Sequence, residues 1–197
     1  DCWQAWPDTH AQVVSNFQWY PYPYLVLISK AITRAIKKGT GLILISLPPR
    51  HGKSEFVSYH VPLWFLGLYP ERRVILATHT ASLSRRYGRR VRNSLLGGAT
   101  GSAAEVAEDS QAAEEWDTKQ GGGMVAVGVG GGLTGKGGHL IIVDDPVKNW
   151  EEADSEAFQV RNTDWFKTAL WTRREPGAVV ILLMTRWHKK DLAGFLL

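Results

Sequence analysis

Short apolar runs bounded by polar or glycine residues recur along the chain, and each run is typical of a buried strand. They cover residues 42–47, 73–78, 139–143 and 178–184, and a fifth run, 124–129, lies inside the glycine-rich passage 121–138. Most of these runs end in polar residues. Because the carboxyl ends of parallel strands share one edge of a sheet, and ligands bind at that edge, we expect the polar residues to form a site there.

Helical patterns separate these runs. Apolar residues recur with a helical period over 25–38, where Gly39 ends the pattern, and helices are also expected over 53–68 and 82–96. The acidic, alanine-rich stretch 103–119 and the stretch 151–172 read as helices by composition, 173–177 reads as a turn, and another helix begins at 191. The alternation predicts an α/β fold with a mostly parallel central sheet flanked by helices. Residues 41–197 form its core and residues 1–40 a small N-terminal lid.

The stretch Leu42–Glu55, L-I-L-I-S-L-P-P-R-H-G-K-S-E, joins a strand to a tight turn and a helix start. A strand followed by Gly-Lys-Ser is typical of a P-loop, in which backbone N–H groups and the helix N-terminus bind phosphate. In that interpretation Gly52 allows close approach, Lys53 contacts the β- and γ-phosphates, and Ser54 is a Mg²⁺ ligand. The motif has Leu47 where its first glycine is expected, and the alternative is a strand–turn–helix junction that binds no nucleotide.

A second candidate for phosphate chemistry is His139–Pro146, H-L-I-I-V-D-D-P. An apolar strand that ends in carboxylates, ninety residues after a P-loop, is the Walker B arrangement. Asp144 is expected to hold Mg²⁺, through water because Mg²⁺ retains several of its waters. The next acid, Asp145, is expected to orient or deprotonate the attacking water.

Two further features each allow two interpretations. Aromatic residues and a glutamine in Phe17–Tyr24 either sandwich an adenine or form a packed lid without a ligand. The arginines of the helix at 82–96 either follow DNA phosphates or form a solvated basic face, and the solvated face is favoured. They are Arg85, Arg86, Arg89, Arg90 and Arg92.

Composition sets limits on these interpretations. With 44% apolar and 21% charged residues the chain is an ordinary globular one, and its net charge of +4 is compatible with nucleic-acid contact. A single cysteine excludes an internal disulfide and a multi-cysteine metal site, and a reducing compartment is the default. The longest apolar run, 178–184, is far shorter than the ~20 residues of a membrane span.

Three segments together closely resemble the ATPase domain of bacteriophage large terminase subunits: P-P-R-H-G-K-S-E, G-V-G-G-G-L-T-G-K-G-G-H-L-I-I-V-D-D-P-V-K and M-T-R-W-H-K-K-D-L-A-G. The resemblance runs in order from about residue 17 to residue 197. It implies an ATP-driven DNA-packaging motor with an ASCE-type P-loop fold, in which an extra strand, 73–78, lies between the Walker A and Walker B strands. The family's nuclease domain lies outside this sequence, so ATP hydrolysis without DNA cleavage is expected.

The resemblance also assigns roles to residues. Nucleotide contacts are expected from Pro49, Arg50, His51, Gly52, Lys53, Ser54 and Glu55, with Gln18, Tyr22 and Tyr24 on the adenine side. The catalytic set is Lys53, Asp144, Asp145, Glu151 and the γ-phosphate sensor Arg50; the metal ligands are Ser54 and Asp144, and Thr185 and Arg186 form the coupling motif. Most terminases have Glu at the position of Asp145, so either Asp145 is the base or Glu151 or Glu152 takes that role. A residue acting in trans on a neighbouring subunit is sought among Lys136, Arg161 and Arg173.

The implied cofactors are ATP and Mg²⁺. The implied partners are double-stranded DNA, a portal protein, a small terminase subunit and further copies in a ring (a pentamer by resemblance), with no membrane and with the host cytoplasm as the site of action. The alternatives are a helicase- or recombinase-like DNA-dependent ATPase, a small-molecule kinase, and a nucleotide-binding module without catalysis.

Overall fold

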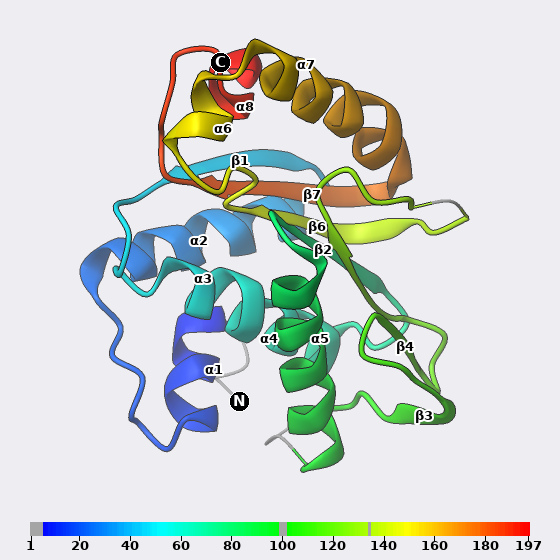
Figure 1. The fold of residues 1–197 in the computed structure, drawn as a ribbon. Helices are drawn as coiled ribbons and strands as arrows, with labels where there is room; N and C mark the ends of the chain where they lie inside the picture. Colours follow the sequence, from blue (N-terminus) through cyan, green and yellow to red (C-terminus); the bar gives the residue numbers. More distant parts are fainter. Residues whose placement is uncertain (1–5, 99–101, 134) are drawn as a thin grey trace.

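A computed structural model describes residues 6–98, 102–133 and 135–197, and its centre is one seven-stranded sheet (Figure 1). In spatial order the strands are β1 (Gly41–Ser46), β7 (Arg174–Met184), β6 (Gly138–Asp144), β2 (Arg73–Thr78), β5 (Gly123–Gly128), β4 (Glu115–Thr118) and β3 (Val106–Gln111). The strands from β1 to β5 in this order pair in parallel, whereas β4 and β3 are antiparallel. The predicted fold, a mostly parallel sheet flanked by helices, is confirmed.

Helices cover both faces of the sheet (Figure 1). One face carries α1 (Pro7–Val14), α2 (Pro23–Lys38), α3 (Lys53–Glu55), the π-turn η2 (Phe56–His60), α4 (Val61–Leu68) and α5 (Ala81–Leu96). The other face carries α6 (Trp150–Asp154), α7 (Glu156–Trp165), which continues through η3 (Phe166–Leu170) and η4 (Trp171–Arg173), and α8 (Leu192–Leu196). No helix in these ranges is both long and apolar enough to cross a membrane.

Two hydrophobic cores lie on the two faces because successive strand side chains point to opposite sides. Ile142 of β6 packs with the core under α1–α5, while its neighbour Ile141 packs with the core under α7 and α8. Strands buried on both faces are continuous apolar runs, as the sequence shows for the central strands. The packed sheet therefore places the ends of β1, β6 and β7 rigidly at one edge.

The helical segment 53–68 forms as predicted, although it changes geometry along its length. Pro62 has no N–H to donate, and it lies just after the π-turn η2, where the helix departs from regular α geometry. The end of α2 also agrees with the prediction, because Gly39 adopts φ 71° and closes the helix in the left-handed conformation.

The helix predicted over 103–119 is wrong: these residues form the β3–β4 hairpin at the sheet edge. Trp116 and Thr118 are buried while Glu115 and Asp117 are half-buried, which is a strand period rather than a helical one. The Trp116 indole N–H donates to the Gly88 carbonyl at 3.1 Å, and β4 pairs with β5. Burial of the tryptophan and pairing along the edge outweigh the helix propensity of the alanines.

Two other expectations are corrected around β7. Residues 174–177 of the expected turn at 173–177 belong to the strand itself, and the left-handed Gly177 (φ 82°) accompanies a register shift between β6 and β7. The strand between those that carry the predicted Walker A and Walker B motifs is β7, not β2, because the order is β1-β7-β6-β2. The end of β7, and with it Thr185, therefore lies between the P-loop and Asp144–Asp145.

Candidate nucleotide site

The loop after β1 is curled by two residues in the left-handed region. Arg50 has φ 62° and Gly52, the N-cap of α3, has φ 70°. Glycine meets no steric penalty at such an angle. A turn with left-handed residues directly before a helix start is the kind of backbone that binds anions in other proteins.

Lys53 is the first residue of α3, and its side chain is buried rather than extended into solvent. Its Nζ donates to Asp145 Oδ1 at 2.9 Å and to Thr185 Oγ1 at 2.8 Å. Thr185 closes the ring: its N–H donates to Asp145 Oδ1 at 2.9 Å, and its hydroxyl donates to the Leu47 carbonyl at 3.2 Å. One ammonium group thus joins the ends of β1, β6 and β7, three elements that are far apart in sequence.

Asp145 turns its backbone away from the strand that precedes it. Its φ is 43°, a conformation uncommon outside glycine although Asp adopts it more readily than most residues, and its N–H donates to the Leu183 carbonyl at 2.8 Å. The turn directs the carboxylate to Lys53 instead of into the sheet.

Asp144 has a different environment from its neighbour, because its partners are neutral hydroxyls. Oδ1 accepts from Ser54 Oγ at 3.0 Å and Oδ2 from Ser58 Oγ at 2.7 Å, and only 1% of the residue is exposed. Burial raises the pKa of Asp144 to about 6, and the two hydroxyl hydrogen bonds oppose that rise. Ser58 was missed by sequence reasoning, although its place four residues after Ser54, on the same helical face, is a usable signal.

The oxygens of Ser54 and Asp144 fit a hard divalent cation such as Mg²⁺. They are already 3.0 Å apart, and a cation would supply the charge that the two hydroxyls do not. The described residues hold no group of three or more His, Cys, Asp or Glu side chains able to bind a metal. The donor set therefore suits Mg²⁺, which retains waters and needs few protein ligands, better than zinc.

A cavity of about 570 Å³ opens beside the P-loop. It brings together residues that are distant in sequence: Gln18, Trp19, Tyr20, Tyr22, Tyr24, Leu25, Arg50, His51, Gly52 and Glu55. The Tyr24 hydroxyl donates to the His51 carbonyl at 3.1 Å, and the rings of Tyr22 and Tyr24 stack with centroids 5.6 Å apart. Trp19 stacks on Phe56 of η2 at 5.1 Å and so attaches the aromatic segment to the helix after the P-loop.

Glu55, on the wall of this cavity, is held by an arginine of α5. Arg90 donates two hydrogen bonds to its carboxylate, at 2.7 and 2.6 Å, and the guanidinium lies 4.0 Å from the centroid of the Tyr59 ring. The hydrogen bond from Arg90 lowers the pKa of Glu55. Arg85 pairs with Glu114 at 2.9 Å, so the arginines of α5 are only partly the solvated face that the sequence favoured. The sequence did not indicate Arg90 as a residue of this site.

Several candidates lie outside this cluster. Glu151 and Glu152 accept hydrogen bonds from the turn at Lys148–Asn149, and neither bonds to the P-loop within the described residues. Among the residues considered for action in trans, Lys136 pairs with Glu115, Arg173 donates to the Ala169 carbonyl at 3.4 Å, and Arg161 is exposed on α7. Pro49 accepts from the His51 ring at 2.8 Å and shapes the loop from within.

Arg186 follows Thr185 but points away from Lys53. Its Nε donates to Asp191 Oδ2 at 2.9 Å. The two residues of the expected coupling motif therefore contact different partners. Thr185 bonds to Lys53 and Asp145, and Arg186 bonds to Asp191 at the start of α8.

Residues 44–193 match the protein family described as terminase large subunit, T4likevirus-type, N-terminal. Among the curated proteins, none matches the chain. The large terminase of bacteriophage HK97 has a similar structure, with a TM-score of 0.56 at 14% identity over 85% of this chain and 34% of that chain. The large terminase of a thermophilic bacteriophage gives 0.45 at 14% identity over 89% of this chain and 37% of that one. Its complex with ADP gives 0.42 at 14% identity over the same shares. The chain spans about a third of the length of these terminases, and the HK97 likeness shows a shared fold.

Proposed function

The chain belongs to the terminase large-subunit family, and we propose that it is an ATP-hydrolysing motor domain that drives double-stranded DNA into a viral procapsid. The observation that carries the proposal is the Lys53 bridge to Asp145 and Thr185. It connects a phosphate-binding lysine, an acid able to orient water, and a residue at the end of the adjoining strand.

Phosphate binding exchanges the partners of Lys53. In the structure the Lys53 ammonium pairs with the Asp145 carboxylate at 2.8 Å. The triphosphate of ATP carries more negative charge and competes for the same cation, while the backbone N–H groups of the loop and the start of α3 bind its oxygens. Lys53 then leaves Asp145 and Thr185, and both residues become free to take new partners.

The released Asp145 carboxylate is the group we propose for orienting the attacking water. It lies at the carboxyl end of β6, beside the P-loop, whereas Glu151 and Glu152 are bonded to a turn elsewhere. Bound Mg²⁺ on Ser54 and Asp144 would neutralise phosphate charge. Arg50 is exposed in the loop and lines the cavity, and we propose that it adds positive charge at the γ-phosphate.

The aromatic cavity is proposed to receive the adenine. Tyrosine rings offer faces on which a base stacks, and Gln18 offers an amide that can both donate to and accept from an adenine edge. Because Tyr24 bonds to the His51 carbonyl, a base bound there also contacts the loop that holds the phosphates.

The DNA, the portal protein, the small terminase subunit and the ring of subunits are proposed from family membership, with the host cytoplasm as the place of action. One surface of the chain suits DNA: α5 carries Arg86 and Arg89, both exposed, beside the ion-paired Arg85. Such arginines bind phosphates independently of sequence. A coupled motor predicts that DNA alters the rate of ATP hydrolysis.

Phosphate release from ATP and Mg²⁺, with and without double-stranded DNA, tests the proposal. We expect turnover by the wild-type protein and a loss of at least about 1,000-fold in Lys53→Ala, because the lysine contacts the transferred phosphoryl group. Lys38→Ala, on the exposed end of α2, is the matched control and is expected to turn over normally. ATP binding without turnover in the wild type would favour a nucleotide-binding module, and DNA strand separation would favour a helicase.

A further inference from the structure

The segment after β7 folds back on itself around a single buried carboxylate, Asp191. Only 1% of its side chain is exposed, against 36% of the Arg186 side chain that it binds. Oδ2 accepts from Arg186 Nε at 2.9 Å, and Oδ1 accepts from the Gly194 N–H at 2.8 Å. Weaker contacts reach Oδ2 from the N–H groups of Trp187 at 3.4 Å and His188 at 3.5 Å. One carboxylate therefore satisfies both the loop and the first turn of α8.

The backbone around Asp191 is packed as tightly as its side chain is bonded. A Cβ on Gly194 would lie 1.9 Å from the Lys189 carbonyl oxygen and 3.2 Å from an Arg186 guanidinium nitrogen. The loop can approach α8 this closely only because residue 194 is a glycine. Leu192 and Ala193, buried in the core under α7 and α8, attach the same turn to the sheet.

The other end of this segment reaches into the nucleotide site. Thr185, which directly precedes Arg186, bonds to Lys53 at 2.8 Å and to Asp145 at 2.9 Å. A displacement at Thr185 is thus one residue away from the Arg186–Asp191 pair. Hydrogen bonds at Thr185 and at Arg186, joined by the peptide bond between these two residues, connect Lys53 to the N-terminus of α8.

We infer that Asp191 is a positioning residue: it ties Thr185–Arg186 to α8, so that a change of partners at Lys53 moves α8. This inference rests on the proposed function, since that function supplies the change of partners. The pair is well suited to the role because a charge-assisted hydrogen bond on a buried carboxylate is stronger and better defined in geometry than a neutral bond. Transmission requires contacts that differ between the two nucleotide states, and the proposed exchange of partners at Lys53 supplies that difference.

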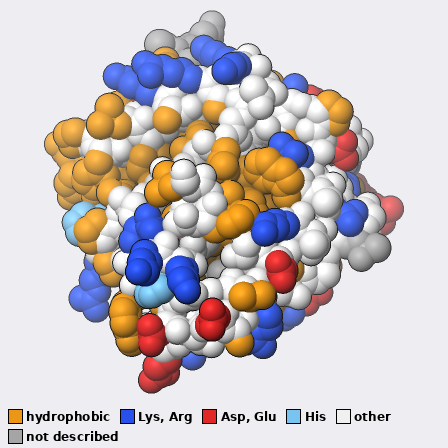
Figure 2. All heavy atoms as spheres, turned by 90° about the horizontal axis from the view of Figure 1, so that it is seen from above, with side chains coloured by type: hydrophobic (Ala, Val, Ile, Leu, Met, Phe, Trp, Pro, Cys, Tyr) orange, Lys and Arg blue, Asp and Glu red, His pale blue; other side chains and the backbone are white. Residues whose placement is uncertain are grey.

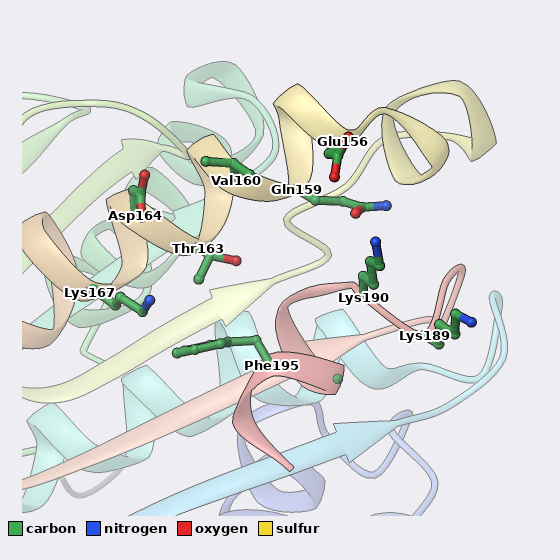
Figure 3. Close-up of a pocket in the computed structure, with 10 residues that line it drawn as sticks. Glu156, Gln159, Val160, Thr163, Asp164, Lys167, Lys189, Lys190 and Phe195 are labelled. Atoms are coloured by element: carbon green, nitrogen blue, oxygen red, sulfur yellow. The ribbon is translucent and has the colours of Figure 1, made fainter.

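The surface that would respond is the groove between α7 and α8. Its volume is about 420 Å³, and Figure 3 shows Gln159 of α7 facing Lys190 of the loop across it. The Lys167 ammonium of η3 lies 4.4 Å from the centroid of the Phe195 ring of α8, and Gln159 Nε2 lies 3.2 Å from His188 Nδ1. Figure 2, which looks down on this side of the molecule, shows exposed hydrophobic side chains with lysine and arginine side chains among them. Movement of α8 would change the shape of this groove.

Hydrogen–deuterium exchange of the protein with and without ATPγS and Mg²⁺ tests the inference. In the wild type we expect nucleotide to change exchange at residues 50–55, at 185–188 and at 192–196. Asp191→Ser keeps an N-cap for α8 but is too short to reach Arg186. In that variant we expect the change at 50–55 to persist and the change at 192–196 to disappear. Arg186→Gln breaks the same pair from the other side and leaves the cap intact, so it is expected to give the same result.

Ser155→Ala is the matched control, because it removes the N-cap of α7 (Ser155 Oγ accepts from the Phe158 N–H at 3.4 Å) without touching Arg186. It is expected to keep nucleotide-dependent exchange at 192–196. In steady state, Asp191→Ser should lower kcat roughly 2- to 30-fold with little change in KM.

Two outcomes overturn the inference, and they are distinguishable. If nucleotide changes exchange at 50–55 but not at 192–196 in the wild type, or if both variants still transmit the change, Asp191 does not position α8 and the proposed function is unaffected. If nucleotide changes exchange at neither place and no phosphate is released, the proposed function fails and the inference fails with it.

Discussion

The two halves of the proposed nucleotide site are built on opposite principles. The proposed catalytic half, Lys53 with Asp144, Asp145 and Thr185, has a buried lysine and a buried Asp144, and every charged or hydroxyl group in it is bonded to another element. The aromatic half is open: Tyr20 is 65% exposed and Tyr22 50% exposed, and the Tyr24 hydroxyl donates a hydrogen bond to the loop.

The difference separates chemistry from recognition. Buried charges must be paired, so the catalytic half can change state only by exchanging one partner for another. Exposed aromatic rings gain stacking contacts when a base binds, and they need no partner when no base is bound. We therefore expect substitutions in the first half to alter kcat and substitutions in the second half to alter KM.

Asp145→Asn is the substitution expected to have the largest effect, and it tests the division between the two halves most directly. The amide keeps the size of the side chain but cannot accept a proton or hold the charge of Lys53. We expect kcat to fall about 100- to 1,000-fold while nucleotide binding is retained or tightened, because Lys53 loses its competing anion. Single-turnover phosphate release and fluorescence titration with an ATP analogue separate the two quantities.

Glu151→Gln is the informative companion to that variant. Glu151 is exposed and bonded only to the turn at Asn149 among its described contacts. If Glu151→Gln lost as much activity as Asp145→Asn, the general base would lie on α6 and the assignment of Asp145 would be wrong.

The two halves also differ in how far the sequence predicts them. Gly52-Lys53-Ser54 and Asp144-Asp145 follow apolar strands, so their meeting at one sheet edge follows from local pattern and the rules of parallel sheets. The position of β7 between β1 and β6 does not follow, because strand order is decided by packing across the whole sheet. The Asp144–Ser58 bond and the Glu55–Arg90 pair depend on the π-turn and on the placement of α5, which local periodicity does not encode.

The β3–β4 hairpin shows the same limit. Its alanine and acidic residues favour a helix locally, and the burial of Trp116 against Gly88 together with pairing to β5 selects a strand. Sequence patterns predict the central strands well because strands buried on both faces are continuous apolar runs, which indicate a buried strand. At an edge of the sheet the tertiary partner decides.

Lowering the pH is a weaker test of the difference between the two halves. It acts on buried histidines that pack beneath the aromatic half. His60 of η2 lies beside Trp19, with ring centroids 5.8 Å apart, and His10 of α1 is also buried. Burial lowers the pKa of His10 and of His60 to about 4, so the unfolded chain binds more protons than the folded chain between pH 6.5 and 4. Stability conferred by the neutral histidines is therefore full above pH 6.5 and is lost as the pH falls toward 4.

We expect the free energy of unfolding of the wild type to fall by about 2 to 3 kcal/mol per histidine over this window. His60→Gln removes one titrating group, so its loss between pH 7.5 and pH 4.5 should be smaller by that amount. Urea unfolding at the two pH values measures the difference. Equal losses in the two proteins would show that folding does not shift the pKa of His60.

The smallest effect is expected from Tyr24→Phe, which removes one hydroxyl and keeps the ring. The lost bond to the His51 carbonyl is exposed, and such a bond contributes about 1 kcal/mol at most. KM for ATP should rise about two- to fivefold with kcat unchanged, because the loop holding the phosphates loses its link to the aromatic wall. Tyr69→Phe, in which the ring stacks under Arg72 at 4.6 Å outside this cavity, is the control and should leave both constants unchanged. A fall in kcat for Tyr24→Phe would mean that the aromatic half takes part in the chemical step, and the division between the two halves would not hold.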